Sequence, residues 1–384
     1  MEYKTIRLSD FATINMGQSP KSEYYNYDGD GLPFLQGNRT FGRLFPVFDT
    51  YTTAPTKIAE QGDIIMSVRA PVGDLNIAPT KLCLGRGVCS LKAKKANQTF
   101  LFYLMKHYVK QLIHKESGTV FGSVNRDDIA NLEVSIPEES VQHKIATVLS
   151  SLDTKIEQNT AINNNLEQQA QALFKSWFID FEPFGGTMPE DWSERYLSEF
   201  VELTQGKYIK DVSVNKTEKY KYPVYGGGGI RGFVAEYTHA DPVVIVGCRG
   251  TCGIVDRTFQ SASITNSVIS FDIKSLLGIN FLYLFLKNRG LTEFISGSAV
   301  PQITKTALSN ISLLVPSENI LKRFEEITGS FYSYITSNKF ENERLAEIRD
   351  ALLPKLMSGE IDVSKVDISD LSYLDKSLFN KETE

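Results

Sequence analysis

Two stretches of this chain carry apolar residues at alternating three- and four-residue steps. In the first, residues 142–177, the apolar positions are Ile145, Leu149, Leu152, Ile156, Leu166, Ala170, Leu173 and Trp177. This is a heptad pattern, which is typical of a helix that packs along one stripe against another helix. The stretch contains no Gly or Pro, and at about 1.5 Å per residue it predicts about 54 Å of helix.

A second stretch near the end of the chain repeats this spacing. Its apolar positions are Phe324, Ile327, Phe331, Tyr334, Leu345, Ile348 and Leu352. Asn159 and Asn163 interrupt the first pattern, and Asn338 occupies in the second pattern the place that Asn159 has in the first. So narrow an apolar stripe needs a partner, and we expect the two helices to pack antiparallel. We assign this packing to Ile145, Leu149, Leu152, Ile156, Leu166, Leu173, Phe324, Phe331, Leu345 and Leu352.

The sequence also repeats outside the two long helices. Leu8-Ser9-Asp10-Phe11 and Gly17 return, equally spaced, as Leu197-Ser198-Glu199-Phe200 and Gly206. Arg69 and Gly73 return as Arg249 and Gly253. The segments Ser117-Gly118, Asn131 and Pro137 return in the same order and with the same spacing as Ser296-Gly297, Asn310 and Pro316. Chance does not keep so many spacings in order, so the chain is an internal duplication.

Each copy begins with short β-rich runs broken by Gly, Pro and Asn, which predict strands and turns. A short helix follows at residues 99–115 and at 278–296, and a last strand ends at a proline in each copy. The predicted fold is α+β, with two pseudo-symmetric mixed α/β domains separated by two long antiparallel helices that form a coiled coil. The segments are domain one (1–137), the first long helix (138–182), domain two (183–316), the second long helix (317–359) and an acidic tail (360–384). We expect most of the tail to be poorly ordered.

The net charge of −5 argues against nucleic-acid binding until it is divided along the chain. Lys and Arg outnumber Asp and Glu by 16 to 13 in residues 1–137 and by 13 to 12 in 183–316. Acidic residues lead by 7 to 3 in 138–182 and by 14 to 9 in 317–384. Two mildly basic domains joined by acidic helices are compatible with DNA bound by the domains, although ordinary solvated surfaces explain the same counts.

The sequence lacks the usual catalytic motifs. There is no phosphate-binding G-x-x-x-x-G-K-[ST], no H-E-x-x-H and no G-x-S-x-G. The Asn-Pro-Pro-aromatic segment of DNA amino-methyltransferases is also missing. We expect Cys83, Cys89, Cys248 and Cys252 to be reduced cysteines rather than metal ligands, because their two spacings differ. With no long apolar segment, we expect a soluble cytoplasmic protein without contact to a membrane.

Polar and basic residues in the loops of both domains are candidates for DNA contacts. Arg69 and Arg249 each follow a β-rich run, and Arg231 follows a run of four glycines that lets a backbone approach a ligand closely. The candidates are Gly17, Gln18, Gln36, Asn38, Arg39, Arg43, Arg69, Arg86, Tyr225, Gly227, Gly228, Arg231 and Arg249. The arginines are also compatible with surface charges or structural ion pairs, and the glycine run with a mobile turn between strands.

The chain resembles the DNA-specificity subunits of type I restriction-modification systems. The resemblance rests on Ser117-Gly118 through Ile136-Pro137, Gln142 with Ile145, Phe174-Lys175-Ser176-Trp177-Phe178, Leu352-Leu353-Pro354-Lys355-Leu356 and Ser358-Gly359-Glu360-Ile361. Gly62-Asp63-Ile64-Ile65, Gly85-Arg86-Gly87 and Tyr225-Gly226 through Gly229-Ile230 are similar to the family's target-recognition domains. One departure is Leu321, which stands where the first copy has Gln142.

This resemblance implies a subunit with no active site and no bound cofactor of its own. Each target-recognition domain would bind one half of a bipartite site in double-stranded DNA, and the helices would dock two methyltransferase subunits that carry S-adenosylmethionine. Restriction and translocation subunits would supply the ATP- and Mg-dependent steps. Two alternatives stay open: the specificity subunit of a related type II bipartite-site system, and a coiled-coil adaptor that does not bind DNA.

Overall fold

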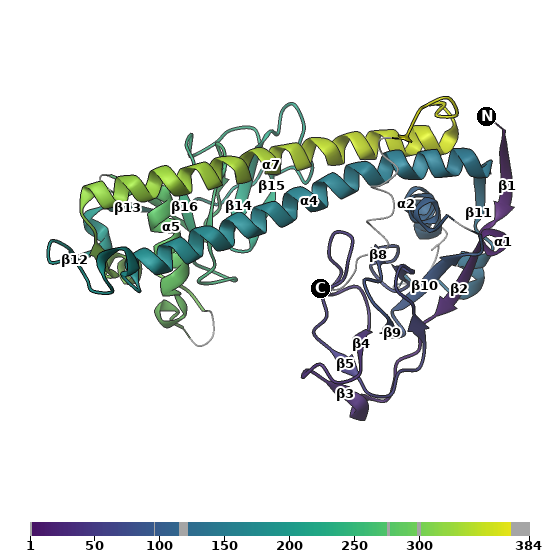
Figure 1. The fold of residues 1–384 in the computed structure, drawn as a ribbon, viewed down its shortest axis with the longest axis horizontal. Helices are drawn as coiled ribbons and strands as arrows, with labels where there is room; N and C mark the ends of the chain where they lie inside the picture. The colour runs from purple at the N-terminus through teal and green to yellow at the C-terminus, as the bar shows by residue number, and fades with distance from the viewer. Residues whose placement is uncertain (1, 96, 115–121, 275–276, 298–300, 370–384) are drawn as a thin grey trace. The chain divides into compact units, whose positions relative to one another are not determined.

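The computed structural model describes residues 2–95, 97–114, 122–274, 277–297 and 301–369 (Figure 1). The repeated pair Ser117-Gly118 and residues 370–384 of the predicted tail lie outside the described residues. The chain divides into two compact units, unit 1 with Met1–Asn159 and Glu341–Glu384, and unit 2 with Thr160–Phe340. Both long helices contribute to both units, because α4 covers Glu139–Phe178 and α7 covers Glu318–Ser358.

Unit 1 contains a four-stranded and a five-stranded sheet and one isolated pair of strands. The strands are β1 (Tyr3–Arg7), β2 (Ala12–Met16), β3 (Tyr25–Asn26), β4 (Leu32–Leu35), β5 (Tyr51–Thr52), β6 (Ile58–Ala59), β7 (Ile64–Ser67), β8 (Leu75–Ile77), β9 (Leu82–Leu84), β10 (Val88–Ala93) and β11 (Glu133–Pro137). The sheets have the orders β2-β10-β7-β8, β3-β5-β4-β9-β6 and β1-β11. The short helices are α1 (Leu8–Phe11), η1 (Ser22–Tyr24), α2 (Gln98–His114) and α3 (Arg126–Ala130).

Unit 2 repeats this plan with fewer strands. The strands are β12 (Ser193–Tyr196), β13 (Val201–Gln205), β14 (Tyr222–Gly226), β15 (Gly229–Val234), β16 (Val244–Gly247), β17 (Val255–Arg257), β18 (Ser263–Ile264), β19 (Val268–Ile273) and β20 (Ser312–Val315). The sheets have the orders β13-β19-β16-β17, β15-β14-β18 and β12-β20. The short helices are η2 (Glu182–Phe184), η3 (Leu197–Glu199), α5 (Ile279–Arg289), η4 (Thr292–Phe294) and α6 (Lys305–Ser309).

The central strands of the two units pair in the same register. Leu91 of β10 lies opposite Ile64 of β7, and their counterparts in the repeat, Phe271 of β19 and Val244 of β16, also lie opposite each other. In the second sheet of each unit, Leu35 of β4 pairs in parallel with Leu84 of β9, as Tyr225 of β14 pairs in parallel with Ile264 of β18. The duplication seen in the sequence is therefore a duplication of fold down to single residue pairs.

In each unit a length of α4 lies antiparallel beside a length of α7 (Figure 1). In unit 1, Asp153 and Asn159 of α4 contact Arg349 and Asn342 of α7. In unit 2, Asn163 contacts Asn338, and the Trp177 ring lies 5.8 Å from that of Phe324. In these contacts, residues with higher numbers on α4 meet residues with lower numbers on α7. The predicted antiparallel pairing is therefore confirmed.

One part of the expected apolar stripe on α7 differs from the structure. Tyr334 and Ile348 are 54% and 39% exposed, whereas Tyr332 and Ile335 are buried. Tyr332 packs edge-on against Tyr283 of α5. A heptad count identifies the stripe that faces a partner helix, but α7 also packs against the domain of unit 2, so a second stripe is buried there.

Each unit has its own core between its central sheet, its short helix and parts of α4 and α7. In unit 1 this core includes Phe100 and Tyr103 of α2 with Leu149 of α4. Val363, in the segment assigned to the tail, is buried in the same core, and Lys144 of α4 donates to the Ser364 carbonyl oxygen at 2.6 Å. In unit 2, Phe281 of α5 packs against Phe174, Phe178 and Phe324.

Candidate nucleic-acid interface

Four loops meet in unit 1, each at the carboxyl end of a strand. They contain Gly17 and Gln18 after β2, Gln36 and Gly37 after β4, Arg69 after β7, and Gly85-Arg86-Gly87 after β9, and we call them loop cluster 1. Backbone hydrogen bonds join them, from Gly17 N to Val88 O at 3.0 Å, from Gly85 N to Leu35 O at 2.7 Å, and from Val68 N to Gly87 O at 2.9 Å. The cluster is therefore a fixed frame rather than a set of independent loops.

Glycine is required where these loops touch through their backbones. A Cβ atom on Gly17 would lie 2.1 Å from the Gly85 carbonyl oxygen and 2.6 Å from that of Val88. Both obstacles are backbone atoms in buried segments, so neither can move aside easily. The repeat of Gly17 as Gly206 thus has a steric cause, because a Cβ atom on Gly206 would lie 2.4 Å from the Ile264 carbonyl oxygen.

Unit 2 carries the equivalent loop cluster 2. Its loops contain Gly206 and Lys207 after β13, Gly227-Gly228 after β14, Arg249 after β16, and Thr265-Asn266-Ser267 after β18. Matching bonds run from Gly206 N to Val268 O at 3.0 Å, from Thr265 N to Tyr225 O at 2.9 Å, and from Cys248 N to Ser267 O at 2.8 Å. Gly227 lies close to Arg249 and Ser267, so these loops also converge.

The predicted residues Gly17, Gln18, Gln36, Arg69 and Arg86 come together in loop cluster 1. Ser19 links two of the loops, because its Oγ donates to Gln36 Oε1 at 2.9 Å and accepts from the Arg86 backbone N at 3.1 Å. Beside them is a hollow of about 400 Å³ whose walls include Tyr25, Phe34 and Arg39. Aromatic walls with amide and guanidinium donors suit contact with nucleotide bases.

Three other predicted residues of domain one make contacts within the protein. Arg39 forms an exposed ion pair with Asp49 at 2.6 Å, and this hydrogen bond helps to hold the pKa of the Asp49 carboxyl below its usual value. Asn38 donates to Asp74 Oδ2 at 2.6 Å. Arg43 lies against α4, where its guanidinium meets Asp153 Oδ1 at 2.6 Å and Glu157 Oε1 at 2.5 Å. Two carboxylates one helical turn apart explain this orientation of Arg43, and its part in DNA binding stays a prediction.

In domain two, the predicted residues Gly227, Gly228 and Arg249 lie in loop cluster 2. Arg231, on β15, covers Gly226, because a Cβ atom there would lie 2.4 Å from Arg231 Cδ. The Tyr225 side chain is buried, so this residue contributes to loop cluster 2 through its carbonyl oxygen, which accepts from Thr265 N. The side chains of Arg69, Arg86 and Arg249 are exposed and form no hydrogen bond or ion pair with the described residues.

Asn266 and Lys207 in loop cluster 2 were not predicted from the sequence. The signal was present, because the same shift in residue number that links Arg69 to Arg249 also links Arg86 to Asn266. Identifying Asn266 as the counterpart of Arg86 requires the repeat to keep its register through this loop. The parallel pairing of β9 with β4 and of β18 with β14 shows that it does.

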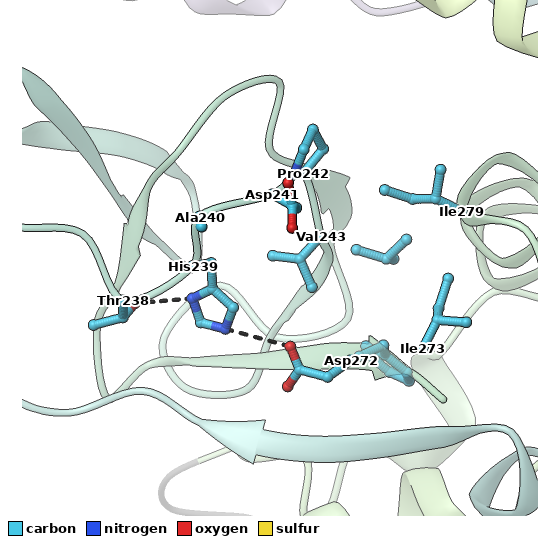
Figure 2. Close-up of a pocket in the computed structure, with 11 residues that line it drawn as sticks. Thr238, His239, Ala240, Asp241, Pro242, Val243, Asp272, Ile273 and Ile279 are labelled. Carbon is cyan, nitrogen blue, oxygen red and sulfur yellow. Dashed lines mark hydrogen bonds and ion pairs between the residues drawn. The ribbon is translucent and has the colours of Figure 1, made fainter. Parts of the chain in front are cut away.

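Another hollow in unit 2, of about 370 Å³, is lined by Thr238, His239, Asp241, Val243, Asp272 and Ile279 among others (Figure 2). His239 Nδ1 lies 2.8 Å from Thr238 Oγ1, and Nε2 lies 3.1 Å from Ser270 Oγ and 3.6 Å from Asp272 Oδ1. A Ser-His-Asp relay needs the carboxylate and the serine on opposite ring nitrogens. Here both lie at Nε2, so the arrangement is not that of a nucleophilic triad.

The described residues contain no group of three or more His, Cys, Asp or Glu side chains arranged to hold a metal ion. Within the same residues, no helix has the length and apolar character needed to span a membrane.

The family model for the type I restriction modification DNA specificity domain matches residues 1–168 and 189–350. The chain belongs to this family. It is a specificity subunit of the type I restriction-modification class, as predicted from the sequence, and the predicted α+β fold with two repeated domains and two long helices is confirmed.

Two curated members of the family illustrate the range of similarity. The putative type I restriction enzyme MjaX specificity subunit of Methanocaldococcus jannaschii is 41% identical over 41% of this chain and 38% of its own length. The type I restriction enzyme HindI specificity subunit of Haemophilus influenzae is 29% identical over 68% of this chain and 77% of its own length. A solved type I restriction-modification S subunit from M. genitalium aligns with a TM-score of 0.59 at 20% identity and covers 92% of this chain and 96% of its own. This last likeness shows the shared fold.

Proposed function

We propose that loop clusters 1 and 2 each read one half of a bipartite site in double-stranded DNA. The observation that carries this proposal is the repetition of one backbone frame in both units, each presenting an exposed arginine at the same place, Arg69 and Arg249. Arginine is the side chain most often used for phosphate and guanine contacts. A coiled-coil adaptor without DNA would need neither the frame nor the exposed charge.

The long helices are the proposed docking site for two methyltransferase subunits. Both carry apolar side chains that the chain itself leaves at the surface, with Ile162 of α4 at 38% exposure and Tyr334 and Ile348 of α7 at 54% and 39%. Apolar anchors at helical spacing suit a partner helix. In this proposal the chain binds no cofactor and acts in the cytoplasm. S-adenosylmethionine belongs to the methyltransferase subunits, and ATP and Mg to the restriction subunits.

The test uses the full chain with methyltransferase subunits of a type I restriction-modification system. The expected result is adenine methylation only when chain, methyltransferase, S-adenosylmethionine and DNA are all present, with binding that weakens steeply as salt rises. Methyl transfer by the isolated chain, or binding indifferent to salt, would contradict the proposal.

An exchange of domains tests the independence of the two clusters. Replacing residues 1–137 by the first domain of another family member should change one half of the methylated site and leave the other half intact. The reciprocal exchange of residues 183–316 should change only the other half. If either exchange altered both halves, the clusters would not be separate readers.

A further inference from the structure

We propose that Arg86 and Asn266 select the base pair at equivalent places of the two half-sites, with Arg86 selecting guanine and Asn266 selecting adenine. The inference rests on the proposed reading of DNA by the two loop clusters. It goes further by assigning to one residue in each cluster the difference between the two recognised sequences.

The turns that carry Arg86 and Asn266 have the same backbone structure. In each, the first residue donates to the strand alongside, Gly85 N to Leu35 O and Thr265 N to Tyr225 O. The third residue accepts from the end of the central strand, through Gly87 O from Val68 N and through Ser267 O from Cys248 N. The turn is closed by Val88 N to Gly85 O at 3.2 Å and by Val268 N to Thr265 O at 3.0 Å.

The central residue of each turn is also held through its backbone, and Arg86 is exposed whereas Asn266 is half-buried. Arg86 N donates to Ser19 Oγ at 3.1 Å, and the Asn266 carbonyl oxygen accepts from Gln205 Nε2 at 2.8 Å. Neither the Arg86 guanidinium nor the Asn266 side-chain amide forms a hydrogen bond with the described residues. A side chain that selects a base needs a fixed backbone and polar atoms that are not already hydrogen-bonded. Binding then costs little conformational entropy.

Equivalent positions of the two loop clusters carry the same side chain in one case and different side chains in another. Arg69 and Arg249 are the same residue at the same place, so they suit a feature that both half-sites have, such as the phosphate backbone. Arg86 and Asn266 differ in charge and in hydrogen-bonding capacity although their backbones match. A difference confined to the side chain can change the recognised base without changing the frame.

The chemistry of the two side chains assigns the bases. A guanidinium only donates, and its fork matches the two acceptors O6 and N7 of guanine. A carboxamide donates and accepts, which matches N7 and the N6 amino group of adenine. Each such bidentate pair discriminates against the wrong base by about 1–3 kcal/mol, which corresponds to about 5- to 150-fold in affinity.

The experiment exchanges the two residues in the complex of the full chain with its methyltransferase subunits. Wild type, Arg86→Asn, Asn266→Arg and the double exchange are each used to select bound duplexes from a random DNA library, which are then sequenced. Arg86→Asn should convert one G·C pair of one half-site to A·T, with a change in preference of about 5- to 150-fold. Asn266→Arg should convert one A·T pair of the other half-site to G·C. The remaining positions should keep their preferences.

Two further variants separate the other outcomes. Arg86→Ala should relax the preference at its base pair alone, and an equal loss of affinity on all sequences would identify a phosphate contact and overturn the inference. Arg86→Lys should keep the dependence on salt but weaken the preference for guanine, because an ammonium group lacks the planar fork. Thermal melting of each complex verifies folding, and the two exchanges lie in different domains, so failure of one to fold leaves the other as the test.

The result for wild type distinguishes this inference from the proposed function. If the wild-type complex enriches no sequence, the reading of DNA by the loop clusters is wrong. If wild type enriches a bipartite site but the exchanges leave every preference unchanged, the clusters read DNA and only the assignment of Arg86 and Asn266 is wrong.

Discussion

Asn338 of α7 donates from Nδ2 to Oδ1 of Asn163 on α4 at 2.9 Å. In unit 1 the contact recurs with the roles exchanged, because Asn159 of α4 donates to Asn342 of α7 at 2.9 Å and to Glu341 at 2.7 Å. The repeat that matches Asn159 to Asn338 also matches Asn163 to Asn342. Asn159 and Asn338 are buried between the two helices, where they interrupt the apolar stripes. Polar pairs at such positions fix the register of paired helices at some cost in stability.

The first prediction concerns this polar layer. Asn338→Leu should lower the free energy of unfolding by about 1 kcal/mol, because it leaves the Asn163 amide without its partner. The double change Asn163→Leu with Asn338→Leu should recover most of that loss, since two apolar side chains can pack where two amides met. Denaturant unfolding of the four members of this cycle measures the coupling. Additive losses would show that the two amides do not support each other.

The second prediction concerns Asp153, which joins three elements in unit 1. Its Oδ1 meets Arg349 of α7 at 2.5 Å and Arg43 at 2.6 Å, and its Oδ2 accepts from Tyr103 of α2 at 2.7 Å. Burial alone would raise the pKa of Asp153. The charge of Arg349, together with Lys106, Tyr103 and Arg43, outweighs burial and holds this pKa below the ordinary value of 3.8. Asp153→Asn should therefore destabilise the protein by about 3–5 kcal/mol, because it removes the buried negative charge that pairs with both Arg349 and Arg43.

The lowered pKa also sets the dependence of this contribution on pH. The contribution is fully present above about pH 4 and is lost as pH falls through the folded-state pKa, since the unfolded chain then binds the proton more readily. Wild type should lose stability in acid more steeply than Asp153→Asn. Asp350→Asn is the matched control, because Asp350 pairs with the same Arg349 but is 60% exposed. It should cost about 1 kcal/mol or less. Equal losses for both variants would show that burial of Asp153 does not matter.

The sequence predicted the elements that depend on local pattern and failed where a distant contact decides the structure. The duplication and the antiparallel helices follow from the spacing of the repeats. Gly17, Gln36, Arg69 and Arg86 were candidates one by one, but their convergence depends on backbone contacts between distant loops. The orientation of Arg43 toward α4 does not, because Asp153 is far away in the sequence and nothing near Arg43 signals it. The burial of Tyr332 instead of Tyr334 likewise depends on the domain that packs against α7. Asn266 was within reach of the repeat but carries no local sign of function.

The third prediction concerns the glycines that let the loops meet. Gly17→Ala should destabilise unit 1 by about 3 kcal/mol or more, because its Cβ would meet two backbone carbonyl oxygens within 2.6 Å. Gly206→Ala should do the same in unit 2. Gly37→Ala is the control in the same cluster, since a Cβ atom there meets no atom within 4 Å. Thermal unfolding measures all three, and a stable Gly17→Ala would contradict the described approach of the loops.

The last prediction concerns Arg69 and Arg249, the arginines that both clusters share. In the proposed reading of two half-sites, the phosphate backbone is the feature that both half-sites share, so we expect both side chains to contact phosphate. Arg69→Ala or Arg249→Ala should weaken binding by a similar factor on every DNA sequence. Each should also reduce the slope of log affinity against log salt by about 0.9, the value for one phosphate contact. Arg43→Ala removes the same charge from domain one but breaks the pairs with Asp153 and Glu157. It should lower stability, and a reduced salt slope in this variant would show that Arg43 also contacts phosphate. If Arg69→Ala instead relaxed the preference at one base pair and kept the salt slope, Arg69 would contact a base. Loop cluster 1 would then contain two base-contacting residues, Arg69 and Arg86.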